Sequence, residues 1–288
     1  MVTQLKKAYP IKTVCRVLGV SRSGFYEHKQ RPERPDLPAV VTLKAAFAAS
    51  GRSYGSRRLK MALRDHGYDL GRHKVRKLMR QHGLKPVWKR KFVHTTNSKH
   101  SLPVAENVLD RQFNPRARDQ AWTSDVTYIR TRSGWLYLAV VMDLFSRRIV
   151  GWAMAPHMQT SLIRDALSMA VQHRRPMRGL VMHSDRGSQY ASYEYQQLLK
   201  QHGLVCSMSR KGNCWNNAVM ERFFLNLKME RVWQRDYANH GEAKRDIVEY
   251  IVGFYNTCRL HSTLNYLPPV IYERQMAAKQ PIQVSEIS

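Results

Sequence analysis

The order of strand-like and helix-like segments after residue 120 is the feature that most limits how this chain can fold. Three segments rich in β-branched and aromatic residues follow one another, with short turns at Ser133-Gly134 and Ser146-Arg147 between them. Turns this short leave room only for antiparallel neighbours, so the pattern predicts a three-stranded meander. The strands are expected at Trp122–Ile129, Trp135–Asp143 and Arg148–Met154.

Helix-like and strand-like segments alternate after the meander. Helices are expected at Ser161–His173, Ser192–His202, Asn216–Glu230 and, last, Glu242–Asn256, and strands at Leu180–His183 and Val205–Met208. This order predicts an α/β fold class with a mixed five-stranded sheet.

The net charge narrows the possible functions. The chain has 288 residues with 48 Lys+Arg and 21 Asp+Glu, a net charge of +27, which favours a polyanionic partner such as nucleic acid. A hydrophobic content of 43% excludes a disordered basic tail. A membrane partner is not expected, because the longest apolar run, Trp135–Met142, is too short to span a bilayer. No helix combines a Lys/Arg face with a Trp/Phe/Leu face that would bind a membrane surface.

The basic residues are concentrated before residue 121. Residues 1–120 hold 27 Lys+Arg against 8 Asp+Glu, whereas residues 121–288 hold 21 against 13. The densest stretch is 51–92, with 14 basic residues and two acids. This asymmetry indicates a DNA-binding front half and a different role for the back half, although a merely solvated basic surface is the alternative.

Residues 1–30 are predicted to form a helix-turn-helix unit. Ile11–Leu18 has helical apolar spacing, Gly19 ends it, and Ser21 can cap a second helix over Arg22–Lys29. In this layout the second helix enters the major groove, so Arg22 and Ser23 are candidate DNA contacts, with packing alone as the alternative. The prolines of Arg31–Pro38 predict a stiff linker, placed at residues 31–50.

Residues 51–92 are predicted to form a second basic helical unit, with helices over Tyr54–His66 and Arg72–His82. Each helix has an apolar stripe backed by a cationic stripe, a pattern that suits contact with successive phosphates. The candidate DNA contacts are Arg57, Arg58, Lys74, Arg76, Lys77, Arg80, Lys89, Arg90 and Lys91. Residues 93–119 are polar and are interpreted as a connector.

Acids are scarce in the α/β region, with six between residues 121 and 221. Asp165 and Glu194 lie within predicted helices and are interpreted as solvated, and Asp143 as a turn former. Three others are candidates for chemistry: Asp125 in mid-strand, Asp185 after the fourth strand and Glu221 near the start of a helix.

Three carboxylates in so basic a chain predict a site for divalent cations. Mg²⁺ prefers oxygen ligands, and two such ions can support an in-line phosphoryl displacement by activating the attacking oxygen and stabilising the leaving one. A structural role for each acid taken singly is the alternative. The four cysteines, Cys15, Cys206, Cys214 and Cys258, have no zinc-ligand spacing and are expected to be reduced thiols of a cytosolic protein.

Four motifs resemble one known family. They are WTSDVTYI (122–129), HSDRGSQY (183–190), SRKGNCWNNAVMERFF (209–224) and YNTCRLHSTLNYLPPVIYE (255–273), and 35 residues separate Asp185 from Glu221. The chain resembles the OrfB-type transposases of bacterial insertion sequences, whose catalytic core is similar to that of retroviral integrases. The resemblance covers essentially the whole chain.

The resemblance implies an RNase H-like DDE core over residues 120–275, followed by a tail at 276–288. It implies that Asp125, Asp185 and Glu221 are catalytic and bind two Mg²⁺ ions, with Mn²⁺ able to substitute. Water and then a DNA 3′-hydroxyl would be the nucleophiles, and no covalent protein–DNA intermediate would form. The implied enzyme is a DDE polynucleotidyl transferase that cleaves and joins strands at the ends of an insertion sequence.

The resemblance also implies partners and a location. The expected partner is double-stranded DNA, both the terminal inverted repeats and the target. A homo-oligomer of at least two copies on DNA is expected, because transposition holds two ends together. Members of such families are often made as longer fusions, so an upstream-frame partner or fusion is a further expectation. The expected location is the bacterial cytoplasm, in association with the nucleoid.

One residue departs from the family pattern. Where many relatives have CWDNA, this chain has Asn216, which can still accept a hydrogen bond but lacks the charge of the acid. Residues near the three acids are candidates for DNA contact, with ordinary surface roles as the alternative. These candidates are Arg186, Arg210, Lys211, Arg222 and Lys228.

Three side-chain roles and two alternative functions remain open. His183 is interpreted as a packed strand-end residue rather than a ligand, and Arg259 and His261 as DNA contacts or caps of the final helix. The alternative functions are a non-catalytic, sequence-specific DNA-binding protein derived from a transposase and an RNase H-type nuclease acting on RNA–DNA hybrids.

Overall fold

A computed structural model of the chain describes residues 9–30, 37–87, 105–109, 114–209 and 218–279. The chain divides into two compact units, Met1–Thr42 and Leu43–Ser288. Across the described ranges, every helix is too short or too polar to cross a membrane.

The first unit contains two short helices joined by a glycine turn, as predicted. These are α2 (Ile11–Val17) and α3 (Arg22–Gln30). Gly19 adopts a positive φ of 63°, which a glycine tolerates readily, and the N–H of Val20 donates to the carbonyl of Cys15 at 2.9 Å. The Oγ of Ser21 accepts from the N–H of Gly24 at 3.2 Å, so the predicted cap is present.

The linker predicted over residues 31–50 is wrong from Leu37 onward. The structure forms α4 there, over Leu37–Ala49. Pro38 lies in the first turn of α4, where a missing N–H costs no intrahelical hydrogen bond. The rest of the segment consists of good helix formers and bulky apolar residues, and Leu43 and Phe47 are buried. The prolines therefore mark the start of a helix rather than an extended linker.

The second basic segment forms the two predicted helices, α5 (Ser56–Asp65) and α6 (Arg72–Gln81). Their apolar stripes are buried: Leu59 and Leu63 on α5, and Val75 and Leu78 on α6. The predicted periodicity is confirmed for this pair.

The α/β region contains the predicted mixed sheet, with strand order β3-β2-β1-β4-β5. Strands β1, β2 and β3 form the antiparallel meander, and β4 and β5 run parallel to β1. The strands are β1 (Ala121–Thr131), β2 (Gly134–Asp143), β3 (Ile149–Ala155), β4 (Val181–Ser184) and β5 (Val205–Met208). Helix α7 (Thr160–Arg174) connects β3 to β4 and packs on one face of the sheet.

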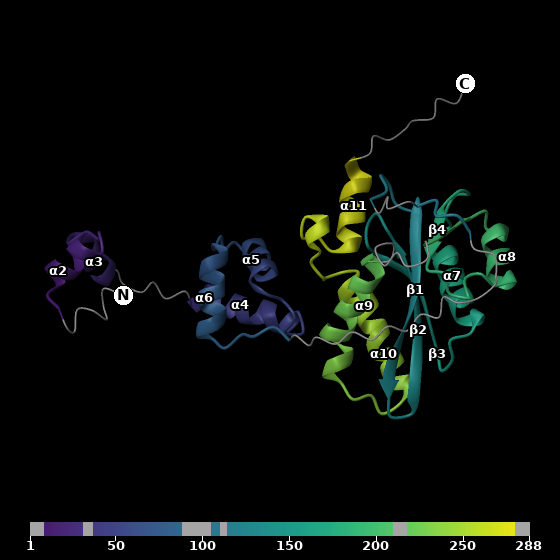
Figure 1. Cartoon of the computed structure of the whole chain (residues 1–288), viewed down its shortest axis with the longest axis horizontal. Coiled ribbons are helices and arrows are strands. Elements are labelled where there is room, and N and C mark those ends of the chain that lie inside the picture. The colour runs from purple at the N-terminus through teal and green to yellow at the C-terminus, as the bar shows by residue number, and fades with distance from the viewer. Residues whose placement is uncertain (1–8, 31–36, 88–104, 110–113, 210–217, 280–288) are drawn as a thin grey trace, which may run out of the picture. The chain divides into compact units, whose positions relative to one another are not determined.

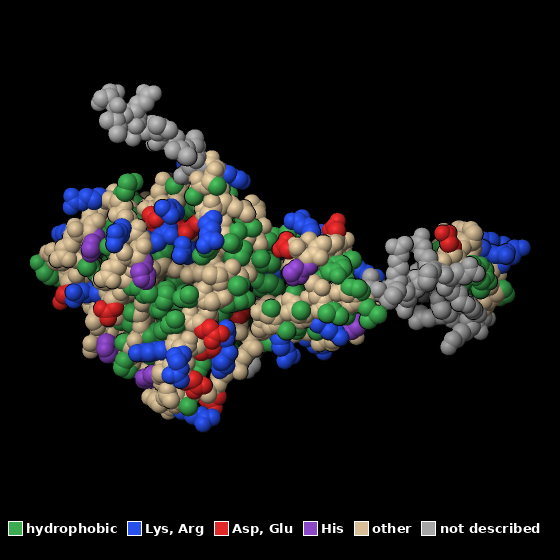
Figure 2. Space-filling model, turned by 180° about the vertical axis from the view of Figure 1, so that it is seen from behind, with side chains coloured by type: hydrophobic (Ala, Val, Ile, Leu, Met, Phe, Trp, Pro, Cys, Tyr) green, Lys and Arg blue, Asp and Glu red, His purple; other side chains and the backbone are tan. Residues whose placement is uncertain are grey.

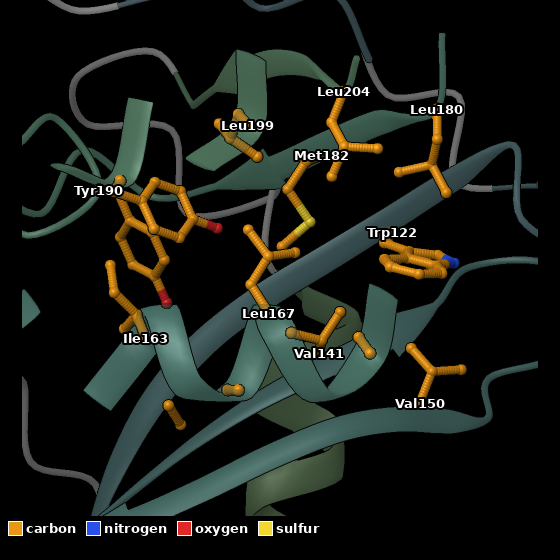
Figure 3. Close-up of a cluster of buried hydrophobic side chains, with 14 of the residues drawn as sticks. Trp122, Val141, Val150, Ile163, Leu167, Leu180, Met182, Tyr190, Leu199 and Leu204 are labelled. Atoms are coloured by element: carbon orange, nitrogen blue, oxygen red, sulfur yellow. The ribbon is translucent and has the colours of Figure 1, made fainter. Parts of the chain in front are cut away.

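Helices cover both faces of the sheet (Figure 1). On one face α7 and α8 (Tyr193–Gln201) bury a cluster that includes Trp122, Leu167 and Met182 (Figure 3). On the other face α9 (Ala218–Glu230) and α10 (His240–Glu249) bury a second cluster around Ile129 and Phe223.

Helix α7 approaches β3 so closely that only glycine fits at residue 151. A Cβ added to Gly151 would collide with the carbonyl oxygen of Ala166 and lie 2.7 Å from the Cβ of Ala170. The absence of a side chain therefore allows the helix to pack directly on the sheet.

The C-terminal region differs from the prediction that Glu242–Asn256 is the final helix. Helix α10 continues into a π-helical turn over Tyr250–Tyr255, and a further helix, α11 (Pro269–Lys279), follows. The proline at the start of α11 suits its first turn. Helix α11 spans the boundary predicted at residue 275, and Glu273 on this helix is buried in ion pairs with Arg148 and Arg174. Two short 3-10 turns complete the described chain, η2 (Val232–Gln234) and η4 (Ser262–Leu264).

Candidate active site and nucleic-acid surface

Asp125 and Asp185 come from neighbouring parallel strands. Thr123 of β1 is paired with His183 of β4, so two further steps along each chain bring Asp125 and Asp185 to the same level of the sheet. Along β1, Trp122 and Val126 face the cluster beneath α7, whereas Ile129 faces the cluster beneath α9. Because side chains alternate, Asp125 lies on the face that α9 covers.

Backbone N–H groups hold both carboxylates. Oδ1 of Asp125 accepts from the N–H of Val126 at 2.7 Å, and Oδ1 of Asp185 accepts from the N–H of Gly187 at 2.9 Å. A Cβ on Gly187 would lie only 3.1 Å from that same Asp185 oxygen. Glycine two residues after Asp185 therefore lets the chain turn tightly around the carboxylate.

Tyr190 interacts electrostatically with both aspartates, and the sequence reasoning did not single it out. Its side chain is buried, and its hydroxyl is 3.1 Å from the Oγ of Ser124. Burial raises the pKa of Tyr190 well above its ordinary value, and the negative charges of Asp125 and Asp185 raise it further. A tyrosine five residues after a candidate acid, in an otherwise polar turn, is the signal that could have identified it.

Glu221 lies in the first turn of α9 and is exposed. Helix α9 covers the face of the sheet that carries Asp125. Among the residues that the structure describes, however, no group of three His, Cys, Asp or Glu side chains is close enough to hold a metal ion. The structure therefore brings Asp125 and Asp185 to adjacent positions without assembling all three acids into one cluster.

Lys228 is half-buried on α9, and its Nζ lies 4.6 Å from the centre of the Tyr128 ring. Burial lowers the pKa of Lys228, and the negative charge of Asp125 opposes that shift. Glu221 and Lys228 are seven residues apart and share one face of the helix. The ammonium group of Lys228 therefore lies on the side of α9 that faces Asp125. Arg222, by contrast, is exposed.

The ends of β4 and β5 are fastened together beside Asp185. His183 is fully buried, with Nδ1 3.0 Å from the Oγ of Ser207 and Nε2 3.3 Å from the Oγ of Ser209, as expected of a packed residue. The half-buried Arg186 donates from Nε to the carbonyl oxygen of Ser209 at 2.6 Å. Arg186, a candidate DNA contact, thus also binds the protein backbone.

Most candidate DNA contacts of the front half are exposed, but Arg58 points inward. Its guanidinium lies 5.4 Å from the centre of the Tyr54 ring and is half-buried. The exposed candidates are Arg22, Ser23, Arg57, Lys74, Arg76, Lys77 and Arg80. Lys89, Arg90, Lys91, Arg210 and Lys211 lie outside the described residues, as does Asn216. On the face drawn in Figure 2, the Lys and Arg side chains of the core are interspersed with Asp and Glu side chains.

Arg259 and His261 are both buried, and neither side chain caps the helix predicted over Glu242–Asn256. The side chain of Arg259 is 1% exposed and binds the carboxylate of Glu230 through Nε and Nη2. His261 is also buried, and burial lowers its pKa well below its ordinary value. The two basic residues in this motif therefore belong to the interior, which a sequence pattern of basic residues does not reveal.

Family models match both halves of the chain. Two models described as an integrase core domain match residues 115–214 and 202–269, and one described as an HTH-like domain matches residues 36–92. The sheet order and these matches show an RNase H-like fold of the integrase type, preceded by a helical HTH-like region.

Solved structures of viral integrases resemble the chain weakly. The simian T-cell lymphotropic virus intasome in complex with PP2A regulatory subunit B56 gamma is 16% identical, with a TM-score of 0.48 and coverage of 74% of this chain and 70% of that chain. The HTLV-2 integrase catalytic core domain in complex with magnesium is 15% identical, with a TM-score of 0.45 and coverage of 56% of this chain and 99% of that chain.

Two curated relatives match over nearly the whole chain. An uncharacterized 31 kDa protein of insertion element IS600 from Shigella sonnei is 44% identical, covering 92% of this chain and 100% of the relative. The transposase InsF for insertion sequence IS3A from Escherichia coli (strain K12) is 41% identical, covering 94% of this chain and 96% of the relative. The chain belongs to this family, the transposases of IS3-type insertion sequences.

Proposed function

We propose that this chain catalyses metal-dependent cleavage and transfer of DNA strands at the ends of an insertion sequence, with Asp125, Asp185 and Glu221 as its catalytic residues. The observation that carries the proposal is the parallel pairing of β1 and β4. It brings two carboxylates to the same level of the sheet, on a face covered by the helix that bears the third.

The donors fit a hard divalent cation. All three proposed ligands are carboxylates, the oxygen donors that Mg²⁺ prefers, and Mn²⁺ accepts the same donors. The pairing of β1 with β4 brings the two aspartates to the same level of the sheet, where a bound cation would offset their negative charge. Bound Mg²⁺ ions, two in this proposal, would supply Lewis-acid stabilisation of the charge that develops on the phosphate oxygens.

The reaction has two displacements at phosphorus. In cleavage, a water oxygen forms a bond to phosphorus while the bond from phosphorus to the 3′-oxygen breaks, leaving a 5′-phosphate and a free 3′-hydroxyl. In transfer, that 3′-hydroxyl attacks a phosphodiester of the target, whose own 3′-oxygen leaves. The role of the protein is to orient the reacting strand and to hold the three carboxylates in place, and no protein–DNA bond forms.

The proposed partners follow from the same reaction. The exposed basic residues of α3, α5 and α6 would bind duplex DNA at the terminal inverted repeats, and target DNA would bind at the core. Two ends must be held together, so at least a dimer on DNA is proposed. An upstream-frame partner or fusion remains part of the proposal.

Strand cleavage by conservative variants tests the assignment. Asp125→Asn, Asp185→Asn and Glu221→Gln are each expected to lower Mg²⁺-dependent cleavage of a terminal-repeat duplex by at least about a thousandfold, because each removes an anionic ligand. Binding of the duplex, measured in the absence of metal, is expected to stay within about twofold, because the phosphate-binding residues are unchanged.

Two exposed acids of the same domain provide matched controls. Asp165→Asn on α7 and Glu194→Gln on α8 remove one charge each from the surface and should leave cleavage unchanged. Normal cleavage by any of the three test variants would remove that residue from the site. Tight, specific binding by a wild-type chain that never cleaves would instead support a non-catalytic DNA-binding protein derived from a transposase.

A further inference from the structure

The α5–α6 pair is joined to the α/β core by a contact centred on Tyr54. Tyr54 is buried, and its hydroxyl accepts from the backbone N–H of Leu260 at 2.8 Å and lies 3.5 Å from the carbonyl oxygen of Cys258. Beside it, a cavity of about 230 Å³ is lined by Ala49 and Ser50 from the helical side and by Phe254 from the core. We refer to the contact between Tyr54 and residues 258–260 as the Tyr54 contact.

The core side of the contact includes a buried ion pair. Arg259, between the two residues that Tyr54 binds, donates from Nε and Nη2 to the carboxylate of Glu230 at 2.8–3.1 Å. The hydroxyl of Tyr250 donates to the same carboxylate at 2.6 Å. Arg259 and Tyr250 thus both donate to the Glu230 carboxylate and form one hydrogen-bonded network. This network holds residues 258–260, which contact Tyr54, in place.

Glu230 is the last residue of α9, the helix that begins next to Glu221. A Cβ added to Gly51, just before Tyr54, would lie 3.7 Å from the carbonyl oxygen of Glu230, so the helical side also reaches the end of α9 directly. Contacts therefore run from Tyr54 to Leu260, and from the neighbouring Arg259 to Glu230 at the end of α9. Helix α9 also carries Glu221, the proposed catalytic glutamate.

We infer that the Tyr54 contact positions DNA held by α5 and α6 relative to the active site. The inference rests on the proposed function. Arg57, Arg76 and Arg80 are exposed on the helical pair, so a duplex bound there is attached to the same body as Glu221. Tyr54, Arg259 and Glu230 are positioning residues in this account, because they act through α9 and touch no substrate.

The physical gain is effective concentration. A scissile phosphate tethered through a fixed contact is presented to the active site at a much higher local concentration than one tethered through a loose chain. Loosening the contact should therefore slow cleavage of bound ends without weakening the binding of those ends. It should leave nonspecific nicking unaffected, since nicking of unrelated DNA does not use the tether.

Tyr54→Phe is the selective test, because it removes only the hydroxyl and keeps the buried ring. With a terminal-repeat duplex at saturation in Mg²⁺, the maximal cleavage rate is expected to fall about tenfold while the Kd changes less than about twofold. Nicking of supercoiled plasmid without the repeat should stay at the wild-type rate. Tyr68→Phe, in the turn between α5 and α6, is the matched control and should behave as wild type in all three assays. An equal fall in both cleavage assays, or no fall in either, would overturn the inference.

Amide hydrogen exchange without metal gives a reading that does not depend on catalysis. In the wild-type chain, adding the terminal-repeat duplex is expected to slow exchange in residues 254–260 and at the C-terminal end of α9. In Tyr54→Phe this slowing should be lost although the duplex binds. Slowing that persists in Tyr54→Phe, or is absent from the wild type, would refute the coupling. A wild-type chain that shows the exchange effect but never cleaves would refute the proposed function and leave the contact supported.

Discussion

The helical pair α5–α6 and the C-terminal part of the core both carry arginines, but the two regions use them differently. On α5 and α6, Arg57, Arg76 and Arg80 are exposed to solvent. In the core, Arg259 is 1% exposed and bonded to Glu230, and Arg174 is 9% exposed and bonded to both Asp119 and Glu273. The first group can neutralise phosphates, whereas the second neutralises carboxylates of the protein itself.

The difference shows that the net charge of +27 overstates the charge available to DNA. Arg174 and Arg259 have their counter-charges inside the fold, so removing either one leaves an uncompensated carboxylate. Each exposed arginine contributes little to stability and much to the attraction of a polyanion. The two groups should therefore respond in opposite ways to the same substitution.

Arg259→Met is expected to have the largest effect. It leaves the Glu230 carboxylate buried without its main partner, and breaking a buried pair in this way costs about 3–5 kcal/mol. Urea unfolding would measure the loss in free energy of unfolding. The matched exposed variant, Arg57→Met, should change that free energy by less than about 0.5 kcal/mol.

A double variant separates the cost of the unpaired charge from the loss of the arginine side chain itself. If the cost arises from an unpaired charge, Glu230→Gln combined with Arg259→Met should be more stable than Arg259→Met alone. An Arg259→Met chain as stable as the wild type would contradict the distinction between interior and exposed arginines.

Asp143 offers a pH-dependent test, because it is a buried acid that accepts hydrogen bonds from Ser146 and from the backbone N–H of Asp119. Burial raises its pKa from 3.8 to about 6. The folded chain therefore holds this proton where the unfolded chain releases it. The stabilisation is fully present below pH 3.8 and is lost as the pH rises through 6.

Asp143→Asn should remove that pH dependence. A shift of about two pKa units corresponds to about 3 kcal/mol between the two ends of the range. The stability of the wild type relative to the variant should therefore fall as the pH rises from 4.5 to 6.5 and then level off. Unfolding in urea at several pH values would measure this difference, and parallel curves would show that Asp143 does not hold a proton in the fold.

The smallest expected effect concerns the exposed group. Arg76→Gln and Lys77→Gln on α6 should each weaken DNA binding by about 1 kcal/mol or less and lower the salt dependence of binding by about one counterion. Stability should not change. A titration at several salt concentrations would measure the slope, and an unchanged slope would mean that these side chains do not contact phosphates.

Much of the fold could be predicted because local patterns determine it. The meander follows from short turns between β-branched segments. The positions of Asp125 and Asp185 follow from β1, which lies in the middle of the sheet, and from β4, which pairs with β1 and ends just before Asp185. Glu221 was grouped with the two aspartates because acids are scarce in this region, and the family motifs implied that the three act together.

The remaining features depend on contacts between distant residues. Arg58 and Arg259 look like surface cations in the sequence, and only the folding of residues 254–260 against Tyr54 and Glu230 places them inside. Helix α4 was missed because its prolines suggested an extended chain, although Pro38 lies where a helix tolerates it. Tyr190 was missed because its electrostatic interaction with two aspartates requires β1 and β4 to be paired.

Binding of Mn²⁺ would show whether Asp125, Asp185 and Glu221 together form one cation site. Free Mn²⁺ can be followed by electron paramagnetic resonance while the full-length chain is titrated in the presence of a terminal-repeat duplex. Two ions are expected to bind per chain above the duplex background, with loss of binding in each of Asp125→Asn, Asp185→Asn and Glu221→Gln, and retention in Asp165→Asn. Unchanged binding in Glu221→Gln would contradict this expectation, because the helix α9 carboxylate would then be no part of the site.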